Sequence, residues 1–190
     1  MTRRRYVLLL LLAATLLLAA SRPVYADSKG QERADIRKMV RETLQRLYKE
    51  EPSAKAAIQK SAGYAVFSNF GMKIFVLGGG KGEGIAVDNA TKKETFMKML
   101  EVQGGLGMGV KKFRVIFVFG GKQQLNDFIN SGWQFGGQTT AAAKLGERGG
   151  AFAGAASVSP GIWMYQLTDS GLAAELTGKG TKYYKDDELN

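Results

Sequence analysis

The sequence predicts an α+β fold, with helices near the N-terminus followed by a series of short strands. Apolar residues recur at helical spacing between residues 34 and 51. Beyond residue 63, short apolar runs of β type alternate with glycine-rich segments. The 25 glycines all follow residue 29, and they are about twice the usual share of a chain. Such a density disfavours a helical bundle and favours tight turns and close backbone approach.

The first 26 residues have the layout of a cleavable export signal. Arg3, Arg4 and Arg5 precede an uncharged apolar run over residues 6–20, and Val24-Tyr25-Ala26 matches a small-x-small cleavage site. The alternative is a retained membrane anchor, which normally needs about 20 apolar residues. We therefore expect cleavage after Ala26 and a periplasmic or secreted protein, exported by either the general or the twin-arginine route.

Cleavage changes the charge that matters for function. It removes four of the 27 basic residues and no acidic residue, which leaves 23 against 17 and a net charge near +6. This moderate excess is compatible with anionic lipid, nucleic acid or acidic polymers, and selects none of them. The remaining chain is long enough for one domain with its own core. We expect a flexible segment over residues 27–33 and a single domain over residues 34–190.

The individual elements follow from local patterns. Ile36, Met39, Val40, Leu44 and Leu47 form one apolar stripe of a helix that Pro52 ends. A short second helix is expected over residues 54–61, and a third over residues 122–131. The expected strands cover residues 64–67, 72–77, 85–87, 95–102, 113–119, 133–145, 151–158 and 162–167, with 113–119 at the centre of the sheet. Turns are expected over residues 68–71 and 104–109, and a solvated tail over residues 179–188.

The residue types limit the chemistry. The sequence has no histidine and no cysteine, so the commonest general base, the thiol nucleophile and the usual zinc, copper and haem ligands are missing. We expect no catalytic residue, metal or cofactor. A hydrolase that uses paired carboxylates stays an alternative. Its candidate acids are scattered through the chain: Glu83, Asp88, Glu101, Asp127, Glu147, Asp169 and Glu175.

The run Gly78-Gly-Gly-Lys-Gly-Glu-Gly84 follows an expected strand, as phosphate-binding loops do. It matches neither the Walker A pattern nor the dinucleotide fingerprint, because Gly82 follows Lys81 and the glycine spacing is different. The interpretation that we favour is a glycine-rich bend between two strands, with Lys81 at its tip able to meet an anion. The interleaving of aromatic and basic residues typical of single-strand nucleic-acid binders is absent, so no nucleic-acid partner is expected.

The helix over residues 34–51 has two possible roles. Its stripe, which includes Ile36 and Val40, is flanked by Arg37, Lys38 and Arg41, a pattern compatible with a membrane interface. The alternative is that the stripe packs on the sheet, as in most amphipathic helices, and periodicity alone favours packing. Lys111, Lys112 and Arg114 form the densest basic cluster among the strands.

The second half of the chain resembles a known family. Tyr165-Gln-Leu-Thr168-Asp-Ser170-Gly171-Leu172, then Leu176-Thr-Gly178 and Tyr183-Tyr184, are similar to the closing signature of the SYLF domain. The segments over 62–67, 78–84, 104–109 and 113–119 stand in that family's usual order, so the resemblance covers residues 35–185. Ala174-Glu175 stands where the family usually has a glycine, and the segment between Gly178 and Tyr183 is shorter.

The SYLF resemblance implies a curved, mostly antiparallel sheet, sandwich-like or barrel-like, with N-terminal amphipathic helices packed on it. It also implies lipid binding without catalysis, through the N-terminal helix and a basic surface. We therefore expect an anionic lipid or membrane surface as the partner, with a possible homo-oligomer. The candidate lipid-binding residues are Ile36, Arg37, Lys38, Val40, Arg41, Lys81, Lys111, Lys112 and Arg114. The alternatives are a self-associating envelope protein without a lipid ligand, and the hydrolase described above.

Overall fold

The computed structural model describes residues 25–74, 77–104, 109–135, 152–172 and 180–190. The predicted export signal therefore lies almost entirely outside the described residues. Three helices are present in the described part: α2 (Tyr25–Glu50), α3 (Ser53–Lys60) and α4 (Lys122–Asn130). The strands are β1 (Gly63–Ile74), β2 (Leu77–Asp88), β3 (Glu94–Gly104), β4 (Gly109–Phe119), β5 (Trp133–Phe135), β6 (Ala156–Ser159), β7 (Ile162–Thr168), β8 (Gly171–Leu172) and β9 (Thr181–Lys185).

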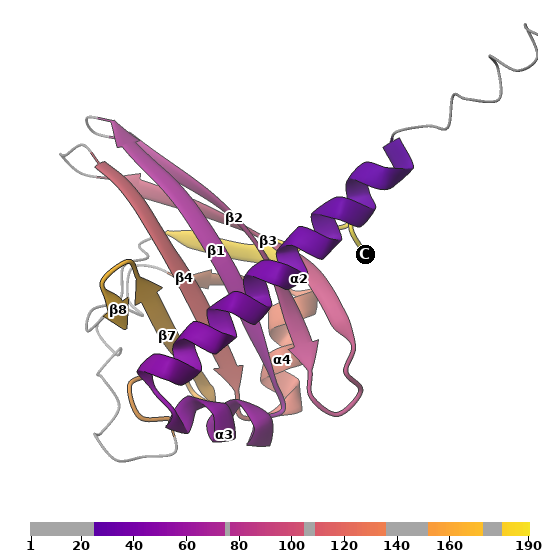
Figure 1. Cartoon of the computed structure of the whole chain (residues 1–190), viewed down its shortest axis with the longest axis vertical. Coiled ribbons are helices and arrows are strands. Elements are labelled where there is room, and N and C mark those ends of the chain that lie inside the picture. Colours follow the sequence, from indigo (N-terminus) through magenta and orange to yellow (C-terminus); the bar gives the residue numbers. More distant parts are fainter. Residues whose placement is uncertain (1–24, 75–76, 105–108, 136–151, 173–179) are drawn as a thin grey trace, which may run out of the picture. The chain divides into compact units, whose positions relative to one another are not determined.

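The strands form one antiparallel sheet with the order β5-β9-β3-β2-β1-β4-β7-β6, and β8 pairs with β7. The long hairpin of β1 and β2 lies at its centre, and β4 pairs with the other side of β1. The sheet is strongly curled (Figure 1). The predicted fold class, an α+β domain with a curved antiparallel sheet, is confirmed. Residues 33–190 form one compact unit.

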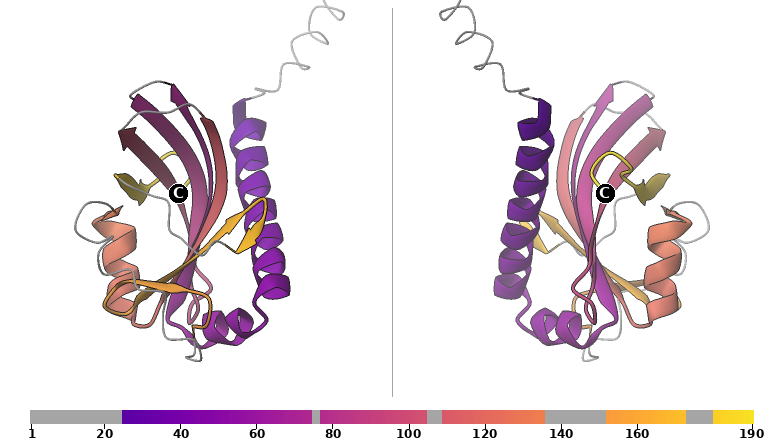
Figure 2. Two further views of the ribbon diagram at one scale, coloured as in Figure 1. Left: turned by 90° about the vertical axis from the view of Figure 1, so that its left-hand side faces the viewer. Right: turned by 90° about the vertical axis from the view of Figure 1, so that its right-hand side faces the viewer.

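The sheet has an apolar core on each of its faces, because alternate side chains of a strand point to opposite sides. On one face, Val66, Ile85 and Ile116 pack with the stripe of α2. On the other, Phe67 and Phe117 pack with α4. Figure 2 shows α2 along one side of the sheet and α4 on the opposite side. The continuous apolar run over residues 113–119 is explained by this arrangement, since β4 is covered on both faces.

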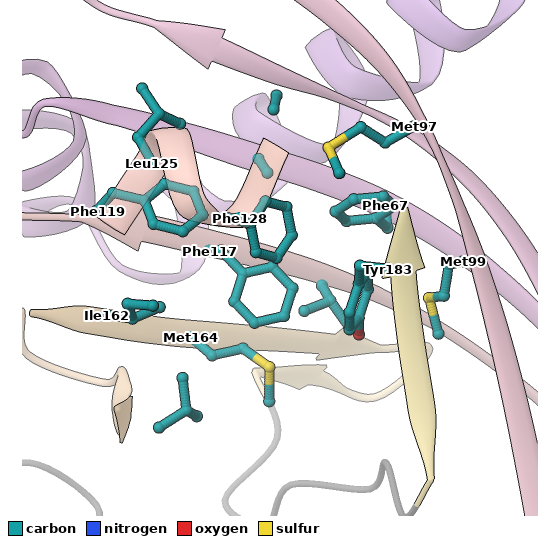
Figure 3. Packing of buried hydrophobic residues seen from close by; sticks show 14 of the residues in the cluster. Phe67, Met97, Met99, Phe117, Phe119, Leu125, Phe128, Ile162, Met164 and Tyr183 are labelled. Carbon is teal, nitrogen blue, oxygen red and sulfur yellow. The ribbon is translucent and has the colours of Figure 1, made fainter. Parts of the chain in front are cut away.

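Aromatic rings fill the core on the α4 side (Figure 3). Phe117 lies 5.4 Å from Phe128 of α4 and 5.0 Å from Tyr183 of β9, measured between ring centroids. Phe67 meets the ring of Tyr183 at 4.8 Å in an edge-on geometry. Edge-on and tilted contacts of this kind are the favoured arrangements of aromatic pairs. This core joins the centre of the sheet to the late strand β9.

The glycine-rich run over residues 78–84 was predicted to bend, and the prediction was wrong. It lies inside β2, which pairs without interruption with β1 from Gly63↔Asp88 to Ile74↔Leu77. The expected turn over residues 68–71 is likewise the middle of β1. A Cβ atom on Gly82 would lie 2.5 Å from the carbonyl oxygen of Ser68. Glycine here allows the close backbone approach of a tightly curled hairpin.

The two ends of the domain are more ordered than the sequence suggests. Residues 27–33, expected to be flexible, are helical and belong to α2, which runs from Tyr25 to Glu50. The expected solvated tail forms β9 and then packs on the sheet, with Leu189 only 2% exposed. The side-chain amide of Asn190 donates to the Phe96 carbonyl at 2.8 Å and its oxygen accepts from the Phe96 amide at 3.0 Å, which continues the pairing.

Candidate functional site

The apolar members of the predicted site are buried inside the domain. Ile36 and Val40 are 4% and 6% exposed, and they belong to the core between α2 and the sheet. Burying each such side chain stabilises the fold by about 2 kcal/mol. The apolar stripe of α2 therefore packs on the sheet, which is the alternative that periodicity favoured. In this conformation neither side chain is available to a membrane.

Two of the predicted cations hold α2 in place. The guanidinium of Arg37 is 2.7 Å from the carboxylate of Glu94 and lies over the ring of Phe96, 5.1 Å from its centroid. Arg114 of β4 donates to the hydroxyl of Thr43 at 3.1 Å, with a second nitrogen 3.8 Å from Glu42. These contacts link α2 to β3 through Arg37 and to β4 through Arg114. Each guanidinium donates one hydrogen bond to a described residue in this way.

Three predicted cations remain exposed: Lys38 and Arg41 on α2, and Lys81 on β2. Positions three apart are neighbours on a helix, so Lys38 and Arg41 share one outer face of α2. None of the three forms an ion pair with a described residue. Lys111 and Lys112 lie in β4 opposite Gly71 and Phe70, and their side chains lie outside the described part of the structure.

Lys81 belongs to a row of residues that crosses the sheet. It pairs with Leu100 of β3, and Leu100 pairs with Lys182 of β9. All three side chains are exposed, and Leu100, 40% exposed, is the only large apolar side chain classed as exposed within the described residues. Neighbouring strands are about 4.8 Å apart, so the backbones of the two lysines, one on each side of Leu100, are about 10 Å from each other. We call Lys81, Leu100 and Lys182 the cross-strand row.

The adjacent row of the sheet has its lysine paired with carboxylates, and Glu83 of β2 lies exposed opposite that lysine. Lys98 of β3 forms ion pairs with Asp186 at 3.1 Å and with Glu188 at 3.7 Å. The hydrogen bond to Asp186 raises the pKa of Lys98 above its usual value, and the charge of that carboxylate adds to the effect. Asp186 itself is buried, so this pair fixes the segment after β9 to β3. Lys81 and Lys182 are the lysines of this part of the sheet that form no ion pair with a described residue.

Leu100 and Lys182 were not among the site residues predicted from the sequence. Met97, Lys98 and Met99 alternate in polarity but Leu100 breaks the pattern, and Thr181-Lys-Tyr-Tyr-Lys185 has no clear period. The row depends on the pairing of β3 with both β2 and β9, which are far apart in the chain. No local pattern contains that register.

The candidate acids of the hydrolase alternative have varied surroundings. Asp88 accepts hydrogen bonds from the amides of Ala90 and Thr91 at 2.8 and 2.9 Å, and these bonds lower the pKa of its carboxyl group. Glu101 is buried in β3, and Glu83 of β2, Asp127 and Asp169 are exposed. Glu147 and Glu175 lie outside the described residues. In the part of the chain that the structure describes, no three acidic side chains form a group that could hold a metal ion.

The described helices have a further property that bears on membranes. None of them combines the length and the apolar character that crossing a bilayer requires.

Comparison with known proteins gives one informative similarity. No protein-family model matches the chain. The chain is 31% identical over 159 residues to Beta cell expansion factor A of Aeromonas veronii, an alignment that covers 83% of this chain and 58% of that protein. The chain thus spans less than two thirds of the length of the curated relative that it matches.

Proposed function

We propose that the exported chain is a non-catalytic, SYLF-type module that binds anionic lipid or another anionic amphiphile at the cell envelope. The observation that carries the proposal is the exposed positive charge of Lys38 and Arg41 on the outer face of α2, where no described carboxylate pairs with them. The mature net charge near +6 acts in the same direction.

Two further findings support the proposal. The curled antiparallel sheet with an N-terminal amphipathic helix on it is the architecture that the SYLF resemblance implies. The similar protein from Aeromonas veronii is named as a factor, and its name states no enzymatic activity. Because the α2 stripe is buried, binding in this conformation is electrostatic and superficial. It uses the charged outer face of the helix, and the apolar stripe stays on the sheet.

The proposal is tested by flotation of the exported protein with vesicles of neutral lipid and with vesicles that contain phosphatidylglycerol. Binding to the anionic vesicles alone is expected, and it should fall steeply as salt rises, because exposed charges are screened. Replacing both cations (Lys38→Gln with Arg41→Gln) should weaken binding by about 1 kcal/mol per charge.

The matched control is Lys55→Gln with Lys60→Gln, which removes the same charge from exposed positions of α3. This variant should bind nearly as well as the parent protein. Absence of binding to either vesicle at low salt would refute the proposed function. Concentration-dependent self-association without lipid, measured by size-exclusion chromatography, would instead favour a structural role.

A further inference from the structure

We infer that the cross-strand row of Lys81, Leu100 and Lys182 is a second contact surface for an anionic lipid bilayer, separate from the face of α2. The inference rests on the proposed function and deepens it by placing lipid contact on the sheet. It uses residues from three strands, β2, β3 and β9.

The geometry of the row is the first argument. An exposed apolar side chain stands between two exposed lysines on one face of a sheet, and neither lysine forms an ion pair with a described residue. The side chain of Lys182 is exposed, and its amine lies 5.9 Å from the centroid of the Tyr184 ring.

The chemistry of the row is the second argument. Lysines keep their ammonium groups in the headgroup layer while their alkyl stems lie on apolar material, and a leucine between them reaches the acyl boundary. A soluble polyanion would engage the lysines but would gain nothing from Leu100. A second copy of the chain, meeting the same row across a two-fold axis, would bring lysine against lysine. The combination therefore fits a bilayer of negative surface charge.

The charge of the row is tested with Lys81→Gln combined with Lys182→Gln, on vesicles that contain phosphatidylglycerol. The partition coefficient should fall about thirtyfold, because each lysine at an anionic surface contributes about 1 kcal/mol and 1.4 kcal/mol is a factor of ten. The α3 double variant, Lys55→Gln with Lys60→Gln, is the control of equal charge. The two substituted lysines are on α3, which precedes β1 and lies at the end of that strand opposite to Ile74 (Figure 1).

The apolar contact is tested with a fluorescent label. The chain has no cysteine, so Leu100→Cys gives a single labelling site for an environment-sensitive nitrobenzoxadiazole dye. Its emission should shift to the blue when anionic vesicles are added, whereas a dye at Gln59→Cys on the exposed face of α3 should not respond. Leu100→Ser should reduce partition severalfold at low and at high salt, since this contribution is apolar. Unchanged thermal midpoints would show that the variants are folded.

Each outcome has a distinct meaning. If the parent protein binds anionic vesicles and the row variant binds as tightly as the α3 control, the row is not a contact surface and the inference fails. If the lysines matter but Leu100→Ser and the dye at position 100 do not respond, the row makes only a charge contact that does not reach the acyl boundary, and the inference also fails. If the parent protein binds no vesicle, the proposed function itself fails.

Discussion

At the scale of single residues, Tyr165 is a destabilising feature of the core between α2 and the sheet. It lies on β7 opposite Ile116, is fully buried, and its hydroxyl group has no hydrogen-bond partner among the described residues. Burial raises its pKa to about 12, and the negative charge of Glu51 adds to the effect. A buried hydroxyl without a partner destabilises the folded state, because it was hydrogen-bonded to water in the unfolded chain.

Replacing this residue with phenylalanine (Tyr165→Phe) should therefore raise the free energy of unfolding at pH 7 by about 1 kcal/mol. The pH dependence follows from the raised pKa. The unfolded tyrosine ionises near pH 10 and the folded one near pH 12, so the wild type loses stability between these values, by roughly 3 kcal/mol for this group. The variant should lose correspondingly less. Urea unfolding at pH 7, 10 and 11 measures this, and a variant that is less stable at pH 7 would show that the hydroxyl has a partner.

At the scale of elements, the hairpin of β1 and β2 depends on Gly82 and Gly84, the two glycines of β2 at which a Cβ atom would collide with the backbone of β1. A Cβ atom on Gly84 would collide with the carbonyl oxygen of Val66 and lie 2.5 Å from the ring of Phe67. The ring of Phe67 belongs to the aromatic core on the α4 side, where Phe117 and Phe128 both contact it at 6.2 Å between centroids. The backbone of β2 therefore approaches β1 more closely than any side chain at position 84 permits.

The substitution Gly84→Ala should lower the free energy of unfolding by about 3 kcal/mol, at the upper end of overpacking effects, because a backbone carbonyl cannot move aside. Gly79→Ala in the same strand is the matched control. Its Cβ atom would find its nearest neighbour, the carbonyl oxygen of Glu101, at 3.8 Å. Chemical denaturation of both variants separates the effects, and equal stabilities would contradict the close approach.

At the scale of the whole domain, one sheet carries two cores, so the two should unfold together. Neighbouring residues of β4 serve opposite sides: Phe117 packs toward α4 and Ile116 toward α2. Each core also has its own tryptophan. Trp133 lies 5.4 Å from Phe117, whereas Trp163 stacks on Phe152 at 3.9 Å. Neither core can lose its strands while the other keeps them.

Single-tryptophan variants test this coupling. In Trp133→Phe and in Trp163→Phe, the remaining tryptophan reports on one core, and far-UV circular dichroism reports on the sheet and helices. Within each variant, fluorescence and circular dichroism should give the same urea midpoint, as a two-state domain requires. Separate midpoints would mean that one face of the sheet unfolds before the other.

The sequence by itself determined the parts of this protein that depend on local pattern. The stripe of α2, the short helices α3 and α4, and the strand that became β4 follow from apolar spacing, because neighbouring residues alone set helical or extended periodicity. The strand expected over residues 95–102 is also present, as β3. The two cations on the outer face of α2, Lys38 and Arg41, were visible in the same way.

Only the tertiary structure decided how these parts meet. Packing on the sheet buried Ile36 and Val40, and it engaged Arg37 and Arg114 in contacts within the molecule. The glycine-rich run is a strand because it pairs with β1 along its whole length. A pattern of neighbouring residues does not contain this pairing. The row of Lys81, Leu100 and Lys182 exists only through strand register, since it joins positions up to 101 residues apart in the chain. Register is set by non-local pairing and by burial of the opposite face, and one sequence does not display either.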